Sequence, residues 1–226
     1  MSPKVFALMS SKLKIGANPR RRRRGHGRAF RLIGLTGSVA MGKSTATHLL
    51  RFLGIPVFDA DAAVHKLLGA KGKAFKAVAA RFPGSGGPKG IDRKVVGAKV
   101  FTDPRALQDL EAILHPLVRE EREQFLRRAA LARRAIVALD IPLLFEGNSQ
   151  DMFDAVAVIT APAFMQHQRA LARPGMTPKR LDAMLARQWP DSRKRRHADA
   201  VIPSSLGKRE TLRRLKQLLR VASCVK

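Results

Sequence analysis

The chain of 226 residues is 45% hydrophobic and 27% charged, which is the composition of a globular protein with one sizeable domain. It has no run of about 18 apolar residues, so no membrane-spanning helix is expected, and its single cysteine, Cys224, excludes a disulfide within the chain and a zinc site built on paired cysteines. Lys and Arg number 44 against 17 Asp and Glu, and this net charge of +27 predicts an anionic partner, either nucleic acid or a small substrate with several phosphates. The cysteine usage suits the reducing cytoplasm, where we expect the protein to act.

The N-terminal segment is the most basic part of the chain. Residues 1–31 hold ten of the Lys and Arg residues, including Arg20–Arg24, and no acid. We expect residues 1–30 to be a basic, disordered extension, or to result from an upstream start codon, in which case Met9 is an alternative start. An organelle transit peptide has a similar composition and is the other interpretation. Positive charge is also in excess in residues 31–226, the expected folded domain, so this domain should itself attract polyanions.

Strands and helices are expected to alternate from residue 31 onward. The apolar run "RLIGLT" (residues 31–36) indicates a buried strand, and apolar residues at helical spacing follow it up to Gly54. A second strand over residues 55–61 ends in acids. The segments expected next are a helical stretch broken near residues 69–72 (62–82), a turn-rich connection (83–90) and two helices (92–101 and 104–134).

Two further apolar runs, residues 135–145 and 154–161, are typical of strands buried on both faces. The remaining segments are a helix (163–172), an arginine-rich region (173–196), a short strand (199–203) and an amphipathic helix (208–220). This alternation predicts an α/β fold, with a parallel sheet flanked by helices.

The connection after the first strand has the pattern of a phosphate-binding loop. Gly37, Gly42, Lys43 and Ser44 match G-x-x-x-x-G-K-[ST], and Thr45 follows. The glycines permit a tight turn whose N–H groups cradle phosphate oxygens at a helix N-terminus. Lys43 would reach the terminal phosphates, and the Ser44 hydroxyl would ligate Mg²⁺. A chance match on a strand–turn–helix connector is the alternative, but the required strand and helix both flank the pattern, which favours a nucleotide site.

Two acids, Asp59 and Asp61, follow the second strand in "FDAD". Ligands bind beside the carboxyl ends of strands in open α/β sheets, so a carboxylate there can accept a proton from an attacking hydroxyl or hold Mg²⁺ through water. Capping of the next helix is the structural alternative. The neighbouring phosphate loop favours the functional interpretation.

Together these motifs resemble the dephospho-coenzyme A kinases. The segments that carry the resemblance occur in the family's order: "GLTGSVAMGKST", "LGIPVFDADAAVHKLL", "LEAILHPLVR", "DIPLLFE" and "LARPGMTPKRLDAMLARQ". The resemblance covers about residues 32–205. It implies a P-loop nucleoside-triphosphate hydrolase fold with a helical acceptor-binding subdomain and a lid over about residues 171–196. It also implies that ATP phosphorylates the ribose 3′-hydroxyl of dephospho-coenzyme A, giving coenzyme A and ADP, the last step of coenzyme A biosynthesis.

The resemblance assigns roles residue by residue. Asp61 matches the family's base, Lys43 and Arg173 the cations that stabilise the transferred phosphoryl group, and Ser44 the Mg²⁺ ligand. The residues implied to bind ATP are Gly37, Ser38, Val39, Ala40, Met41, Gly42, Lys43, Ser44, Thr45, Arg169, Arg187 and Gln188, with Lys179 a further lid candidate. The residues implied to bind the acceptor are Asp59, His115, Pro116, Leu143 and Glu146.

Structural alternatives stay open for several of these residues. A lone histidine such as His115 is usually a core or helix-surface residue, and Glu146 is also compatible with pinning a loop. Asp140 and Glu146 flank a strand end, where either can assist Mg²⁺ or contact substrate. The lid arginines are also compatible with a solvated helix face, although phosphoryl transfer needs cations on the developing charge.

The phosphate loop departs from its relatives at three positions. Family loops often have glycine, glycine and serine where this chain has Ser38, Ala40 and Met41. The outer frame from Gly37 to Thr45 is kept, so the substitutions bear on the geometry of the loop rather than on phosphate binding.

Two other functions compete with this one. Another small-molecule kinase would share the loop, and a nucleic-acid-binding ATPase would explain the charge. With one Trp, no Tyr and 11 Phe, the chain offers few stacking platforms for bases. We therefore expect small-molecule partners, ATP and dephospho-coenzyme A, with no specific nucleic acid and no membrane; the sequence indicates no oligomeric state.

Overall fold

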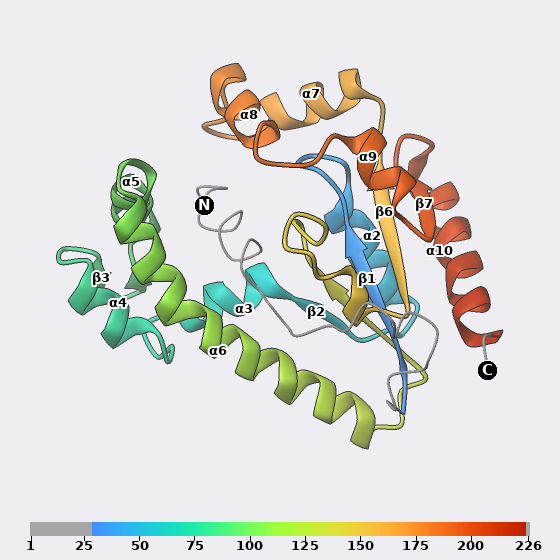
Figure 1. Cartoon of the computed structure of the whole chain (residues 1–226), viewed down its shortest axis with the longest axis horizontal. Coiled ribbons are helices and arrows are strands. Elements are labelled where there is room, and N and C mark those ends of the chain that lie inside the picture. The colour runs from blue at the N-terminus through green and yellow to red at the C-terminus, as the bar shows by residue number, and fades with distance from the viewer. Residues whose placement is uncertain (1–28, 225–226) are drawn as a thin grey trace.

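The structure is a computed structural model that describes residues 29–224 as a five-stranded parallel sheet with helices on both faces (Figure 1). The strands are β1 (Arg31–Thr36), β2 (Val57–Asp59), β5 (Ile136–Asp140), β6 (Ala155–Thr160) and β7 (Ala200–Pro203), in the order β2-β5-β1-β6-β7. Every neighbouring pair in this sheet is parallel. The predicted α/β architecture is confirmed, whereas the predicted basic extension lies almost wholly outside the described residues.

The central strand β1 shows why these apolar runs form buried strands. Leu32 faces one side of the sheet, where it joins the larger hydrophobic core with Phe58. Ile33 and Leu35 face the other side, where they pack with Leu50 of the following helix. Both faces are therefore covered, so a continuous apolar run rather than an alternating one is required.

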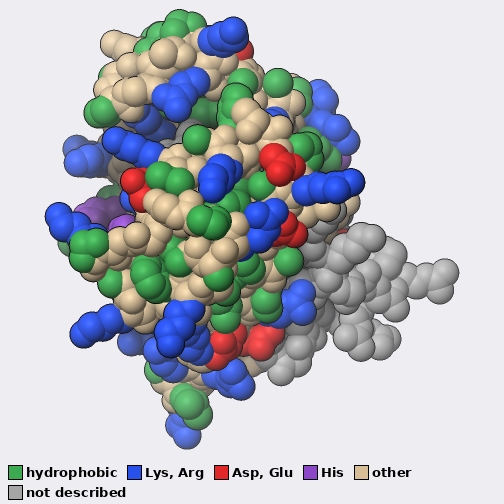
Figure 2. All heavy atoms as spheres, turned by 90° about the vertical axis from the view of Figure 1, so that its left-hand side faces the viewer, with side chains coloured by type: hydrophobic (Ala, Val, Ile, Leu, Met, Phe, Trp, Pro, Cys, Tyr) green, Lys and Arg blue, Asp and Glu red, His purple; other side chains and the backbone are tan. Residues whose placement is uncertain are grey.

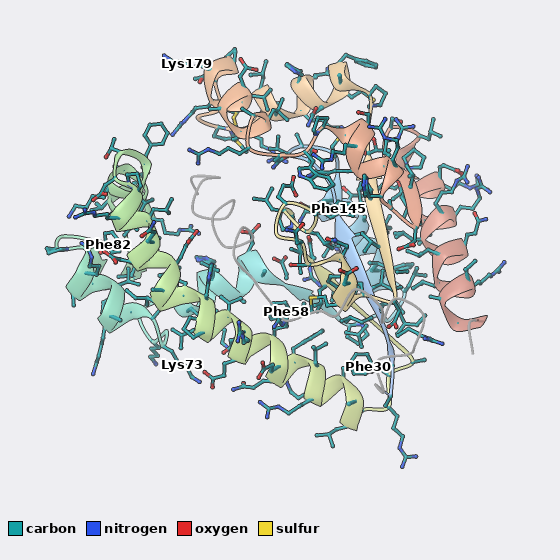
Figure 3. All side chains as sticks on the ribbon, viewed as in Figure 1. Phe30, Phe58, Lys73, Phe82, Phe145 and Lys179 are labelled. Atoms are coloured by element: carbon teal, nitrogen blue, oxygen red, sulfur yellow. The ribbon has the colours of Figure 1, made fainter. Side chains whose placement is uncertain are left out.

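The helices divide between the two faces and the carboxyl edge of the sheet. On one face lie α2 (Lys43–Phe52) and α10 (Gly207–Cys224), and on the other α3 (Ala60–Leu67) and the 28-residue α6 (Pro104–Leu131). In Figure 3 the labelled Phe30 and Phe58 lie between α6 and the sheet. α7 (Ala163–Leu171), α8 (Pro178–Leu185) and α9 (Asp191–Arg196) continue from the carboxyl end of β6, where α7 and α8 form the upper edge in Figure 1.

A helical subdomain projects from the sheet beside α3. It contains α4 (Phe75–Arg81), α5 (Arg93–Thr102) and the outer half of α6, and Figure 1 shows it across from α7 and α8. The turn-rich connection forms a short hairpin of β3 (Gly86–Gly87) and β4 (Gly90–Ile91), which was not predicted. Gly90 is needed there, because its φ is +112° and a Cβ would lie 2.5 Å from the Leu68 carbonyl oxygen.

Two predicted strand ends are wrong. The strand predicted over residues 135–145 stops at Asp140, because Pro142 has no N–H to continue the ladder; a turn and the 3₁₀ helix Gln150–Met152 follow. The strand predicted over residues 55–61 stops at Asp59, which caps α3, so Asp61 lies in the first helical turn. Within residues 29–224, no helix has the length and apolar composition needed to cross a membrane.

Core packing gives a direct test with two leucines of the same helix. Leu110 of α6 is 2% exposed and Leu131, the last residue of α6, is 84% exposed. Leu110→Ala should lower the free energy of unfolding by about 2–5 kcal/mol, because it removes buried methyl groups and leaves a cavity. Leu131→Ala should change it by less than about 0.5 kcal/mol. Equal losses in denaturant unfolding would contradict the position of α6 on the sheet.

Candidate active site

The phosphate loop lies between β1 and α2, at the carboxyl edge of the sheet. Gly37 packs so closely on β6 that a Cβ would lie 2.6 Å from the Ile159 carbonyl oxygen. Gly42 has a φ of +88° and is the N-cap of α2, with no side chain in the capping position. The first N–H groups of α2 are therefore open to an anion, and both predicted glycine requirements are met.

The three bulkier loop residues are accommodated by the surrounding structure. Ser38 is buried, and Met41, 2% exposed, accepts the Ala161 N–H on its sulfur at 3.1 Å. Ala40 adopts a left-handed φ of 58°, and its side chain packs with Ala170 and Leu181 of α7 and α8. Met41 thus contacts the residue that follows β6, and Ala40 packs against α7 and α8.

Lys43 and Ser44 begin α2, as predicted. The Lys43 ammonium pairs with a carboxylate oxygen of Asp140 at the end of β5, and the other Asp140 oxygen accepts the Thr47 hydroxyl at 2.8 Å. Asp140 itself is buried. Thr45 is half-buried in the first turn of α2, and the Ser44 side chain is exposed there.

The oxygen donors next to Lys43, in the chain or in space, fit Mg²⁺ bound together with a nucleotide. A serine hydroxyl and the carboxylates of Asp61 and Asp140, which interact electrostatically, supply only oxygen donors. Within residues 29–224 no group of three His, Cys, Asp or Glu forms a metal cage.

The two acids of "FDAD" have different surroundings. Asp59 accepts the Ala62 N–H at 3.1 Å as the N-cap of α3, and its other oxygen lies 3.7 Å from the Arg51 guanidinium. Asp61 is largely buried, and burial raises the pKa of its carboxyl from 3.8 to about 7. Lys43 opposes this rise most strongly, while the negative charges of Asp59 and Asp140 reinforce it.

Two glutamines hold the phosphate loop at Val39. Gln188, which lies between α8 and α9, accepts the Val39 N–H on Oε1 at 3.1 Å. Gln166 of α7 is buried and donates to the Val39 carbonyl at 2.9 Å. The Gln188 Nε2 has no hydrogen-bond partner among residues 29–224, so its N–H groups are available to a phosphate oxygen at this loop.

Arg169 of α7 reaches the same loop through Ser204, which follows β7. The Arg169 guanidinium donates to the Ser204 hydroxyl at 2.8 Å and to its carbonyl at 3.2 Å, and that hydroxyl donates to the Met41 carbonyl at 2.8 Å. A Cβ on Gly42 would lie 2.7 Å from the Ser204 oxygen. Arg169 is thus fixed at the loop, whereas Arg173, Lys179 and Arg187 are exposed and form no ion pair in the described part of the chain.

The predicted acceptor residues are less closely gathered. His115, half-buried, and Pro116, exposed, lie on α6, which packs against α3 and so faces the helix of Asp61. Leu143 is 3% exposed in the turn after β5. Glu146, in the same turn, forms an ion pair with Lys194 at 2.9 Å and accepts the Trp189 N–H at 2.7 Å.

Sequence reasoning missed four polar residues of this region. They are Gln166 and Ser204, which follow the carboxyl ends of β6 and β7, Trp189, which precedes α9, and Lys194 within α9. A polar residue directly after a buried strand, as Ser204 is, could have been found by the rule that identified Asp59. Gln166 and Lys194 carry no local signal, because each acts on a partner far away in the sequence.

Basic side chains spread over the face of the molecule on the side of the helical subdomain, with small groups of Asp and Glu between them (Figure 2). This distribution suits anionic ligands.

Comparison with known proteins identifies one family. The sequence profile of the family described as "Dephospho-CoA kinase" matches residues 31–209. A dephospho-CoA kinase of Rhodospirillum rubrum is 54% identical over 192 residues, which are 84% of this chain and 91% of the relative. One of Novosphingobium aromaticivorans is 49% identical over 190 residues, 84% of this chain and 93% of the relative.

Two solved structures are similar over nearly their whole length. TT1252 from Thermus thermophilus has a TM-score of 0.74 and 32% identity, covering 85% of this chain and 97% of its own. The dephospho-CoA kinase from Campylobacter jejuni has a TM-score of 0.59 and 24% identity, covering 86% of this chain and 98% of its own, and supports the fold alone.

The burial of Asp61 predicts a pH-dependent stability difference. Between about pH 4 and pH 7 the folded chain keeps the Asp61 proton that the unfolded chain has lost, so this group's contribution to the free energy of unfolding falls as pH rises. Asp61→Asn should therefore be more stable than the wild type at pH 8, by roughly 2–4 kcal/mol, and equally stable near pH 4. Denaturant unfolding at both pH values checks this, and a pH-independent difference would contradict it.

Proposed function

Because the chain belongs to the dephospho-CoA kinase family, we propose that it transfers the γ-phosphoryl group of ATP to the ribose 3′-hydroxyl of dephospho-CoA in the last step of CoA biosynthesis. The observation that carries this proposal is the combination of a phosphate loop, with Lys43 at its end, and a buried carboxyl, Asp61, whose pKa is raised to about 7. A nucleotide site alone binds ATP, whereas a nearby base also provides for an acceptor hydroxyl.

Asp61 acts on the acceptor hydroxyl. Near neutral pH its carboxyl is partly ionised, so it accepts the hydroxyl proton as the oxygen attacks, and a base with a pKa close to the working pH is the most effective. Within residues 29–224 no hydrogen bond occupies its oxygens, which leaves both for the acceptor. The same carboxyl orients the oxygen in line with the γ-phosphorus.

The nucleotide phosphates bind at the N-terminus of α2. The loop N–H groups and the Lys43 ammonium, aligned by Asp140, compensate the phosphate charge, and the Gln188 Nε2 and Arg169 guanidinium add donors beside the loop. The Ser44 hydroxyl would hold Mg²⁺, which would supply positive charge to offset the negative charge that develops on the phosphates.

The lid supplies further cations. Arg173 and Arg187 are exposed and lack ion-pair partners in the described chain, so their charges are available for the transferring phosphoryl group. Closure of residues 171–196 over the nucleotide would also exclude water, whose attack would hydrolyse ATP. His115 and Pro116, proposed to bind the acceptor, lie on α6, which packs against α3, the helix of Asp61.

The roles of the two acids can be separated by matched substitutions. Asp61→Asn should lower kcat by about 10²–10⁴-fold and leave the KM values for both substrates nearly unchanged, because it removes the base. Asp59→Asn retains a good helix cap and should keep kcat within a few-fold. It should also move the acid limb of the pH–rate profile to lower pH, because it removes a negative charge that raises the pKa of Asp61.

Acceptor-dependent ADP release measures both variants, with dephospho-CoA compared against nucleosides and nucleotides. Release that dephospho-CoA does not stimulate would overturn the proposed acceptor. Full turnover by Asp61→Asn would remove the base while leaving the acceptor standing.

Arg173 tests the role of the lid. Arg173→Ala should lower kcat by about 10²-fold or more, as expected for a cation that stabilises transition-state charge. Its melting temperature should match that of the wild type, since the side chain is exposed. Arg209→Ala, an exposed arginine of α10, is the control for loss of one positive charge. If the two variants have equal activity, Arg173 contributes only to the net charge.

A further inference from the structure

Lys194 is the one lysine among residues 29–224 whose side chain is fully buried, at 0% exposure, and it lies in the short helix α9 that returns from the lid. Every other basic side chain of α9 is exposed. Burying an ammonium group costs several kcal/mol unless a partner compensates it. Burial lowers the pKa of Lys194, and the negative charges of Glu146 and Asp191 oppose this effect.

The partner of Lys194 is a carboxylate that has a second connection. The Lys194 Nζ lies 2.9 Å from Glu146 Oε1, and the same oxygen accepts the Trp189 N–H at 2.7 Å. Glu146 belongs to the turn after β5, whereas Trp189 lies two residues before the start of α9. The Glu146 Oε1 atom therefore connects the turn after β5 to the segment from Trp189 to Lys194 at two points.

The ring of Trp189 is fixed on both faces. It stacks on Phe145 with ring centroids 5.7 Å apart and planes at 10°, and the Arg193 guanidinium lies 3.5 Å above the ring centroid. In Figure 3 the labelled Phe145 lies near the centre of the molecule, where the turn after β5 meets α9. Trp189 is the only tryptophan of the chain, so its fluorescence reports on this contact alone.

The residue before Trp189 reaches the nucleotide site. Gln188 accepts the Val39 N–H of the phosphate loop at 3.1 Å. The contacts thus run without a gap from Lys194 to Glu146, to the Trp189 backbone, and through Gln188 to the loop. Thr160 at the end of β6 reinforces the segment by donating to Asp191 of α9 at 2.7 Å.

We propose that Lys194 is a positioning residue for nucleotide binding: by holding the Glu146 carboxylate it fixes Trp189, and so keeps the Gln188 carboxamide on the phosphate loop. The inference rests on the proposed function for the identity of the ligand, ATP. It assigns Glu146 to this chain of contacts, alongside any contact with the acceptor.

The test measures MgADP binding to the full chain by titration calorimetry, without acceptor. Lys194→Met should weaken binding about tenfold, the effect of losing one well-placed hydrogen bond. It should also shift Trp189 emission to longer wavelength, because the ring becomes more solvated. In steady state, KM for ATP should rise in proportion, while kcat and KM for dephospho-CoA change less than threefold.

Two controls separate positioning from charge and from stability. Arg196→Met removes an exposed positive charge two positions further along α9, and should leave MgADP binding unchanged. Leu110→Ala destabilises the chain through α6, and should also bind MgADP like the wild type while it is folded. Weakening of binding by either control to the level of Lys194→Met would overturn the proposal.

A double-mutant cycle gives the decisive comparison, and its partner variant keeps the test valid if Lys194→Met folds poorly. Gln188→Ala should weaken MgADP binding by itself, and adding Lys194→Met should weaken it no further, because both changes break the same chain of contacts. Additive losses, or wild-type affinity in a folded Lys194→Met, would overturn the proposal. Because the assay needs no acceptor, failure of the proposed reaction would show separately, as normal MgADP binding without dephospho-CoA-dependent ADP release.

Discussion

The buried carboxylate of Asp140 is the interaction on which the arrangement of the site depends. Its two oxygens hold Lys43 and Thr47, which lie four residues apart on one face of α2. One acid at the end of β5 therefore fixes both the distance of α2 from the sheet and its rotation about its own axis. Both oxygens are partnered, which offsets the cost of burying the charge. The contacts of Asp140 with Lys43 and Thr47 therefore set the direction in which the N-terminus of α2 points, and with it the position of the phosphate loop.

The loop shows how a departure from a glycine-rich pattern can be nearly neutral for stability. A left-handed backbone costs alanine about 1–2 kcal/mol relative to glycine. Burial of the Ala40 methyl group against Ala170 and Leu181 returns about 0.8 kcal/mol, and the smaller entropy of alanine in the unfolded chain returns about 0.4–1 kcal/mol. The gains and the cost are similar. The side chain consequently changes the contact of the loop with α7 and α8 more than it changes the free energy of unfolding.

Local chemistry made part of this molecule predictable from sequence. The apolar runs identified the five strands of the main sheet, and the glycine spacing placed Gly37 and Gly42 where the backbone requires them. The ends of two strands were predicted wrongly, because the apolar character of the segments was given more weight than a proline and a helix-capping residue. Both of these signals are present in the local sequence. The partners of Lys43, Arg169 and Lys194 could not be predicted from the local sequence. Each partner lies 35 to 97 residues away, and the order of the strands in the sheet decides which residues meet. The Gly-rich hairpin was missed because two-residue strands leave no periodicity.

The two acids of "FDAD" show how surroundings, rather than residue type, decide a role. Both carboxyls lie at the start of α3, two residues apart. Asp59 accepts the Ala62 N–H on one oxygen and holds the other near Arg51, so both of its oxygens have partners within the protein. Asp61 faces inward in the first turn, where burial disfavours its charge and no hydrogen bond within the described chain satisfies it. A carboxyl that is costly to ionise and has no internal partner gains most from an incoming hydroxyl that donates to it. The cap at Asp59 fixes where α3 begins and which of its side chains turns toward Lys43, which supports the proposal that Asp61 is the base.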